Sequence, residues 1–139
     1  SEISGGERNV TIRNCRMYAD NWGPIRFKSQ PSRGGLIENI TVESVTLHTT
    51  RSFLDVNMEW RMVGELPPRS EVLTQLKNIR IINVHGDVEN VGTLRGFAEA
   101  PFKSDSFYFE NCKINAKKAL TKVNADAVSF VGLDVHLVE

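Results

Sequence analysis

A ten-residue pattern recurs five times along the chain and limits the folds that it can adopt. The five copies align without gaps and begin at residues 8, 38, 77, 105 and 126. Their third and fifth positions are apolar throughout, and their eighth and tenth positions are apolar apart from one glycine. Such self-similarity is typical of solenoid proteins, in which each repeat buries its apolar face against its neighbours.

The spacing of these apolar positions predicts a bend inside each repeat. Side chains alternate between the two faces of a strand, so positions three and five cannot share a face with positions eight and ten unless the chain turns between them. The seventh position carries residues that tolerate a left-handed turn conformation, namely Asn14, Ser44, Asn83, Asn111 and Gly132. Each repeat is therefore predicted to form a strand, a one-residue corner and a second strand.

Stacking of these units predicts an all-β parallel β-helix of about five coils, one for each repeat. Further apolar-alternating runs at 25–27, 53–58 and 119–123 are expected to supply another wall. Helical periodicity is absent except for a short candidate at 69–76. A leucine-rich repeat is the main alternative, but regular leucines are missing and Asn14 follows the strand residue Ile12 by two positions instead of three.

Length and charge narrow the function classes. The 139 residues are expected to form a single domain, 1–139. Seventeen Lys and Arg balance seventeen Asp and Glu, so no global charge favours nucleic acid or an anionic membrane surface. No apolar run is long enough to span a bilayer, and the first residues lack the pattern of a signal peptide. Because the sequence begins with Ser1, we expect it to be part of a longer protein.

The two cysteines and three histidines give no sign of a metal or disulfide site. Cys15 and Cys112 share a repeat column but are three coils apart, about 14 Å at the usual strand spacing, so they are expected to be buried thiols. The histidines are scattered without the spacing of metal ligands. No metal and no cofactor is therefore expected.

The segment Arg26-Phe27-Lys28 is the clearest candidate binding element. On an extended strand, a spacing of two places Arg26 and Lys28 on one face and Phe27 on the other. A guanidinium fork beside an ammonium group suits an anionic ligand, and a carboxylate is the simplest fit. The alternative is a pair of solvated charges on an exposed strand.

Four motifs in the first sixty residues occur in a characteristic order: SEISGG at 1–6, RNVTIRNC at 8–15, IRFKS at 25–29 and RGGLIENI at 33–40. In this order and spacing the segment resembles the family 28 glycoside hydrolases, the polygalacturonase family. That family carries an Arg-Ile-Lys motif followed by a glycine-rich turn, and here the motif reads Arg-Phe-Lys. The resemblance implies a right-handed single-stranded parallel β-helix and a secreted or periplasmic protein that degrades pectin.

The resemblance assigns Arg26 and Lys28 to binding the carboxylate of a uronic-acid unit in a pectic polysaccharide or oligogalacturonide. The family places an aromatic residue near the same cleft one coil later, and Trp60 occupies that neighbourhood. Its indole suits stacking on a sugar ring, and anchoring of the following loop remains the alternative. Arg33 is expected to be a solvated turn residue before the Gly34-Gly35 bend, with a charge contribution to the cleft as the alternative.

The family's catalytic segments, Asn-Thr-Asp, Asp-Asp and Gly-His-Gly, are absent from this sequence. Inverting hydrolysis needs two carboxyl groups about 6.5–9.5 Å apart. The acidic residues near the motif are expected to be solvated outer-face residues instead, and they are Asp20, Glu38, Asp55 and Glu59. We therefore expect the C-terminal, substrate-binding coils of such an enzyme, inactive alone, or a non-catalytic β-helix for carbohydrate binding or structure.

If upstream coils are missing, the first repeat presents an uncapped apolar core and unpaired backbone groups. The expected partner is then a second copy of the chain, associating end to end through its N-terminal coil.

Overall fold

The computed structural model describes residues 5–19, 21–61 and 67–139. Eight strands form this part of the chain: β1 (Gly6–Met17), β2 (Ile25–Lys28), β3 (Leu36–Asn57), β4 (Gln75–Arg95), β5 (Phe107–Glu110), β6 (Cys112–Lys118), β7 (Thr121–Val123) and β8 (Leu133–Leu137). Within the described ranges there is no helix, including the short one expected at 69–76, where a loop leads into β4. No helix long and apolar enough to cross a membrane occurs in this part.

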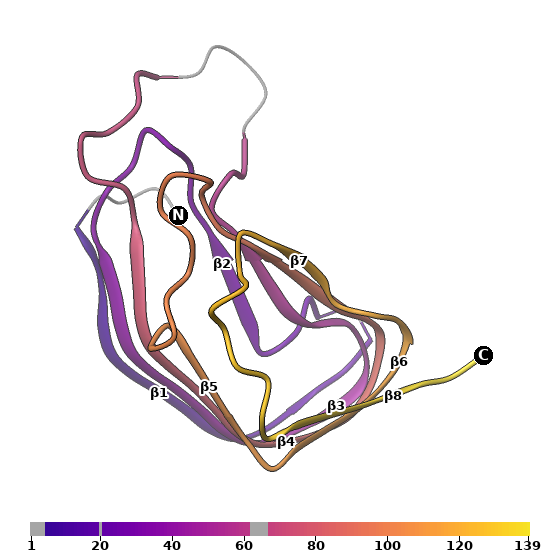
Figure 1. Cartoon of the computed structure of the whole chain (residues 1–139). Helices are drawn as coiled ribbons and strands as arrows, with labels where there is room; N and C mark the ends of the chain where they lie inside the picture. Colours follow the sequence, from indigo (N-terminus) through magenta and orange to yellow (C-terminus); the bar gives the residue numbers. More distant parts are fainter. Residues whose placement is uncertain (1–4, 20, 62–66) are drawn as a thin grey trace.

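All strands belong to one parallel sheet. Its order is β1-β3-β4-β6-β8, with β2 paired to β3 and with β5 and β7 paired to β4. Figure 1 shows that the successive strands follow almost the same path, one behind another, and that the sheet is bent and not closed. The predicted all-β parallel architecture is therefore confirmed.

The strand register reproduces the alignment of the sequence repeats. The third position pairs in the order Val10, Ile40, Ile79 and Phe107. The eighth and tenth positions of the last two repeats also pair, as in Cys112 with Leu133. Equal positions in successive repeats are thus stacked neighbours, as expected from the alignment.

The predicted corner at position seven is present in all five repeats. Asn14, Ser44, Asn83 and Asn111 have φ angles between 47° and 56°, and Gly132 has a φ of 91°. These values lie in the region that only glycine and short polar residues adopt readily. The bend turns the second half of each repeat and lets both halves face one core.

The bends divide the sheet into three walls, which Figure 1 shows in cross-section. The first wall holds residues 6–13, 36–43, 75–82 and strand β5, and the second wall lies beyond the corner and includes β6 and β8. The third wall holds β2, residues 54–57, residues 92–95 and β7, paired in that order. It comes from the apolar runs that the sequence identified as another wall.

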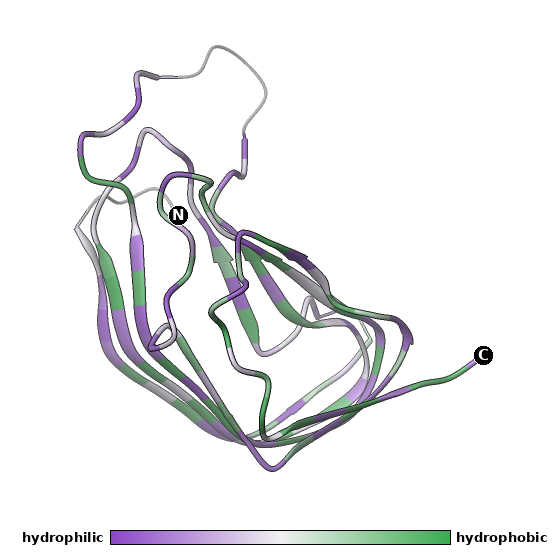
Figure 2. Ribbon diagram, in the orientation of Figure 1, coloured by the Kyte–Doolittle hydropathy of each residue, from purple (hydrophilic) through white to green (hydrophobic). Residues whose placement is uncertain are grey.

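The core lies between the walls and is made of the stacked apolar columns. Figure 2 shows the alternation of hydrophobic and hydrophilic residues along the strands. The largest fully buried side chains come from all three walls and include Phe53, Leu54, Ile79, Ile81, Leu94 and Ile114. Phe107, Phe109 and Phe130 form a stack of rings inside this core, with centroid distances of 6.4 and 5.6 Å. Phe109 and Phe130 occupy the fifth position of successive repeats, so this pair stacks equivalent positions on each other.

The outermost repeats are less buried than the central ones. Val10 in the first repeat is 40% exposed, whereas its partner Ile40 in the second is 3% exposed. In the last repeat, Val135 is 37% exposed, whereas Ile114 beneath it is 1% exposed. The apolar columns thus continue to both edges of the described sheet.

The last repeat departs from the predicted pattern. Its second half forms β8, but residues 126–130 do not form a strand. Val128 is nevertheless buried and Phe130 packs against the core. These residues keep their apolar contacts without the ladder, because side-chain burial does not require strand hydrogen bonds on the outermost repeat.

The second position of the first three repeats also holds residues with a left-handed backbone conformation. Asn9, Asn39 and Asn78 have φ angles of 55–57°. Their side chains form a ladder, with Asn39 Nδ2 donating to Asn9 Oδ1 at 3.1 Å and Asn78 Nδ2 donating to Asn39 Oδ1 at 2.9 Å. Asn111 Nδ2 donates to Asn83 Oδ1 in the same way at the position-seven corner. Asparagine thus supplies both the backbone conformation and a contact between repeats.

The corner geometry predicts the effect of replacing Asn83. Asn83→Val and Asn83→Gly both remove the side-chain bond to Asn111, but only valine must also be forced to positive φ. We expect the valine variant to be less stable than the glycine variant by about 1–2 kcal/mol. Urea denaturation followed by circular dichroism measures the difference, and equal midpoints would contradict the strained corner.

The exposed edge predicts self-association. Among the described residues, β1 pairs only with β3, so its other edge carries unpaired backbone groups. If β1 of one copy continued the register beyond β8 of another, Arg16 would face Asp134, because both are ninth positions. We expect concentration-dependent association in sedimentation velocity that Arg16→Asp weakens. A chain that stays monomeric at every concentration would contradict this expectation.

Candidate functional site

Strand β2 presents its two cations on the outer surface of the third wall. Ile25 is buried and Phe27 packs against the core, whereas Arg26 is exposed and Lys28 is half-buried. The predicted facing of the Arg-Phe-Lys segment is therefore confirmed. Pairing of β2 with residues 54–57 holds the backbone beneath both cations in a regular ladder.

Arg26 is held between an aromatic ring and a carboxylate. Its guanidinium carbon lies 3.8 Å from the centre of the Trp22 ring. Its Nε donates to Asp55 Oδ2 at 3.0 Å, and Asp55 is its direct neighbour in the register. The two contacts orient the guanidinium, and the part of its donor fork not used by Asp55 remains for another acceptor.

Lys28 has a similar aromatic neighbour. Its Nζ lies 4.5 Å from the centre of the Trp60 ring. Trp60 is fixed beside the end of β2, because its backbone N–H donates to the carbonyl oxygen of Ser29 at 2.9 Å. The structure thus brings Trp60 to Lys28. The indole has no lone-pair acceptor, so an ammonium group above its face can still donate N–H bonds to a ligand.

The charged residues around Arg26 and Lys28 have a net positive charge. Arg51 also lies over the Trp22 ring, 4.8 Å from its centre. The residues linked by these contacts therefore include three cations, Arg26, Lys28 and Arg51, and one carboxylate, Asp55. We call these four residues, with Trp22 and Trp60, the cationic–aromatic cluster. The excess of positive charge suits an acid group, and an indole face that no cation covers suits an apolar ring face.

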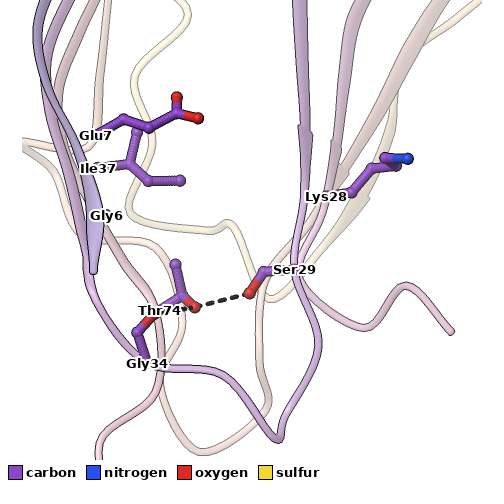
Figure 3. Close-up of a pocket in the computed structure, with 7 residues that line it drawn as sticks. All are labelled: Gly6, Glu7, Lys28, Ser29, Gly34, Ile37 and Thr74. Carbon is purple, nitrogen blue, oxygen red and sulfur yellow. Dashed lines mark hydrogen bonds between the residues drawn. The ribbon is translucent and has the colours of Figure 1, made fainter. Parts of the chain in front are cut away.

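The cluster is an open surface and not an enclosed pocket. A cavity of about 30 Å³ lies between β2 and the first wall, and it has room for a water molecule but not for a sugar. Figure 3 shows Glu7, Ile37, Ser29 and Thr74 around it, with Lys28 pointing away. Ser29 and Thr74 close its base through a hydroxyl contact of 2.7 Å. Lys28 lines this cavity as well as the outer surface, but the cavity is too small to hold a sugar unit.

Arg33 is buried, so the expectation that it is a solvated turn residue is wrong. Its exposure is only 8%, and its backbone is held in the turn by a bond from its N–H to Gln30 and one from Thr74 Oγ1 to its carbonyl oxygen. Gly35 follows with a φ of 97°, as the bend requires. The turn is packed tightly enough to take the arginine out of water.

Two of the acidic residues near the motif, Asp55 and Glu38, are ion-pair partners of arginines. Asp55 accepts from Arg26, and Glu38 lies 3.2 Å from Arg8 Nε on the first wall. Glu59 is half-buried, and its backbone N–H donates to Asn57 Oδ1. Asp20 lies outside the described residues. The structure therefore does not bring Glu38 to Asp55, which are on different walls.

The thiols and imidazoles form no site in the described part of the chain. Both cysteines are free there, Cys112 buried and Cys15 half-buried. Burial raises the pKa of the Cys112 thiol, which keeps it protonated at neutral pH. His48 stacks on Tyr18 with ring centres 4.9 Å apart. Residues 5–19, 21–61 and 67–139 contain no group of three or more side chains suited to a metal ion.

Another cation, Arg80, lies over an aromatic ring on the first wall. Arg80 is 5.4 Å from the centre of the Tyr108 ring, beside a hollow of about 440 Å³ that Lys77, Asn78 and Asp105 also line. The residues that line the hollow include no tryptophan, unlike the cationic–aromatic cluster. We therefore do not assign an acidic ligand to it.

Comparison with known protein families, with curated proteins and with solved structures finds no match to this chain. The resemblance to the family 28 glycoside hydrolases therefore remains a hypothesis based on the residues alone.

Sequence reasoning missed Trp22, Arg51 and the role of Asp55 as a partner. Trp22 is four residues before Arg26, which places it in the preceding loop with no pattern to indicate its direction. Asp55 is the register partner of Arg26, so aligning β2 with residues 54–57 would have revealed the pair. Both segments alternate apolar and polar residues, and this alternation indicates how they align.

Proposed function

We propose that this chain is the substrate-binding portion of a pectin-degrading, polygalacturonase-like glycoside hydrolase. In this proposal, Arg26 and Lys28 bind the carboxylate of a uronate unit, and the intact enzyme hydrolyses galacturonosidic bonds with inversion. The supporting observation is the placement of both cations on one rigid strand face, each against an indole. A carboxylated sugar combines the two features that this surface suits, an anion and an apolar ring face.

The same proposal includes the handedness and the number of coils of the fold. The stacked repeats correspond to a right-handed single-stranded parallel β-helix of about five coils, one for each repeat in the sequence. A secreted or periplasmic location follows from the family resemblance. A single domain, 1–139, agrees with the continuous sheet and with the core shared by all three walls.

A non-catalytic β-helix, used for carbohydrate binding or as a structural solenoid, is the second candidate. The absence of the family's Asn-Thr-Asp, Asp-Asp and Gly-His-Gly segments from the sequence favours it. Both candidates use the cationic–aromatic cluster if the ligand is an acidic sugar, and only the first needs catalytic coils elsewhere.

The carboxylate clamp predicts that Arg26→Ala and Lys28→Ala each weaken oligogalacturonate binding about tenfold, since a charge-assisted hydrogen bond contributes roughly 1.5–3 kcal/mol. Isothermal titration calorimetry measures the affinity. Arg80→Ala is the matched control, because Arg80 is an exposed strand arginine over an aromatic ring on another wall. Unchanged affinity in both clamp variants would refute the clamp.

The missing catalytic segments predict that the 139-residue chain does not hydrolyse polygalacturonate. Reducing ends released during prolonged incubation measure this directly. Release above the level of an Arg26→Ala, Lys28→Ala double variant would show that the chain is catalytic by itself.

A further inference from the structure

The outer face of the third wall continues beyond β2, and its register defines two parallel rows. One row holds Arg26, Asp55, Thr93 and Thr121, and the other holds Lys28, Asn57, Arg95 and Val123. Directly paired residues of a parallel sheet point to the same side. Their burial agrees, because Leu54, Val56 and Leu94, which alternate with them, are in the core.

The two rows differ in charge. Asp55 interrupts the first row beside Arg26 and would repel an anion that continued along it. The second row carries no carboxylate, and an amide, Asn57, lies between its two cations. An anionic ligand bound at Lys28 can therefore continue along the second row, across the strands.

Arg95 is the second cation of that row. It is half-buried and ends β4, where its carbonyl oxygen accepts a bond from Met58 N–H at 2.9 Å. Its side chain makes no ion pair, hydrogen bond or ring contact with another residue of the described ranges, whereas Arg26 has both Asp55 and Trp22. Within the described ranges, Arg95 thus presents its donor fork from a backbone that the ladder holds in place.

The separation of the two cations determines the size of the ligand. Lys28 and Arg95 are two strands apart, so their backbones are separated by about 10 Å at the usual strand spacing. At that separation each cation can bind an acid group of its own. Two acid groups on one extended molecule would then span the distance between Lys28 and Arg95.

We infer that Arg95 binds a second carboxylate of the ligand held at Arg26 and Lys28. The ligand class is then a linear oligosaccharide of several uronic-acid units, lying across the strands along the row of Lys28, Asn57 and Arg95. This inference depends on the proposed function, because it requires that the first acid group bind at the clamp. Asn57 supplies a hydrogen-bond partner between the two anionic positions.

Titration calorimetry with a length series of ligands tests the inference. Galacturonic acid, digalacturonate and tetragalacturonate are titrated into the unaltered chain and into the Arg95→Ala, Arg95→Lys, Arg26→Ala and Arg80→Ala variants. We expect Arg95→Ala to weaken tetragalacturonate binding about tenfold and to leave galacturonic acid binding unchanged, since only the longer ligand reaches a second cation. Arg95→Lys should restore part of the loss, and Arg80→Ala should change nothing.

The outcomes separate the two proposals. If Arg26→Ala weakens every ligand while Arg95→Ala weakens none, the clamp is correct and the second carboxylate site is wrong. If Arg95→Ala weakens galacturonic acid as much as tetragalacturonate, both cations serve one acid group and the extended row is wrong. If no ligand binds the unaltered, folded chain, the proposed function fails and the inference fails with it. Circular dichroism of each variant confirms that the fold is retained.

Discussion

In-register stacking of like positions is the constraint on which the rest of the structure depends. Each repeat places its apolar residues directly over those of the previous one, so a single register decides the whole core. A shift of one residue would move every apolar side chain to the outer face. The left-handed corner at position seven is essential to this arrangement, because it lets both halves of a repeat face inward.

The same stacking produces the cationic surface. The third wall is a ladder whose inner residues are buried, and its outer residues are therefore presented in straight rows at a fixed spacing. Arg26 and Asp55 meet because they are neighbours in one row, and Lys28 and Arg95 share the other. A rigid sheet holds these groups in place without a loop that must first become ordered, and less conformational entropy is then lost on binding.

Aromatic residues from the flanking loops complete that surface. Trp22 precedes β2 and Trp60 follows the third-wall part of β3, yet both indoles lie against cations of the same strand. Each ring covers one side of a charged group and leaves its donors accessible. In the proposed function, this arrangement lets an open surface bind a charged sugar ring.

The sequence by itself determined the repeat, the corners, the parallel stacking and the outward facing of Arg26 and Lys28, because strand periodicity and left-handed residues act locally. It could not determine that Arg33 is buried, that residues 126–130 form no strand, or that Trp22 and Asp55 contact Arg26 while Arg51 lies over the same indole. Those features depend on how segments about thirty residues apart come into contact. Only the tertiary structure fixes such contacts, because loop direction and packing have no periodic signal in the chain.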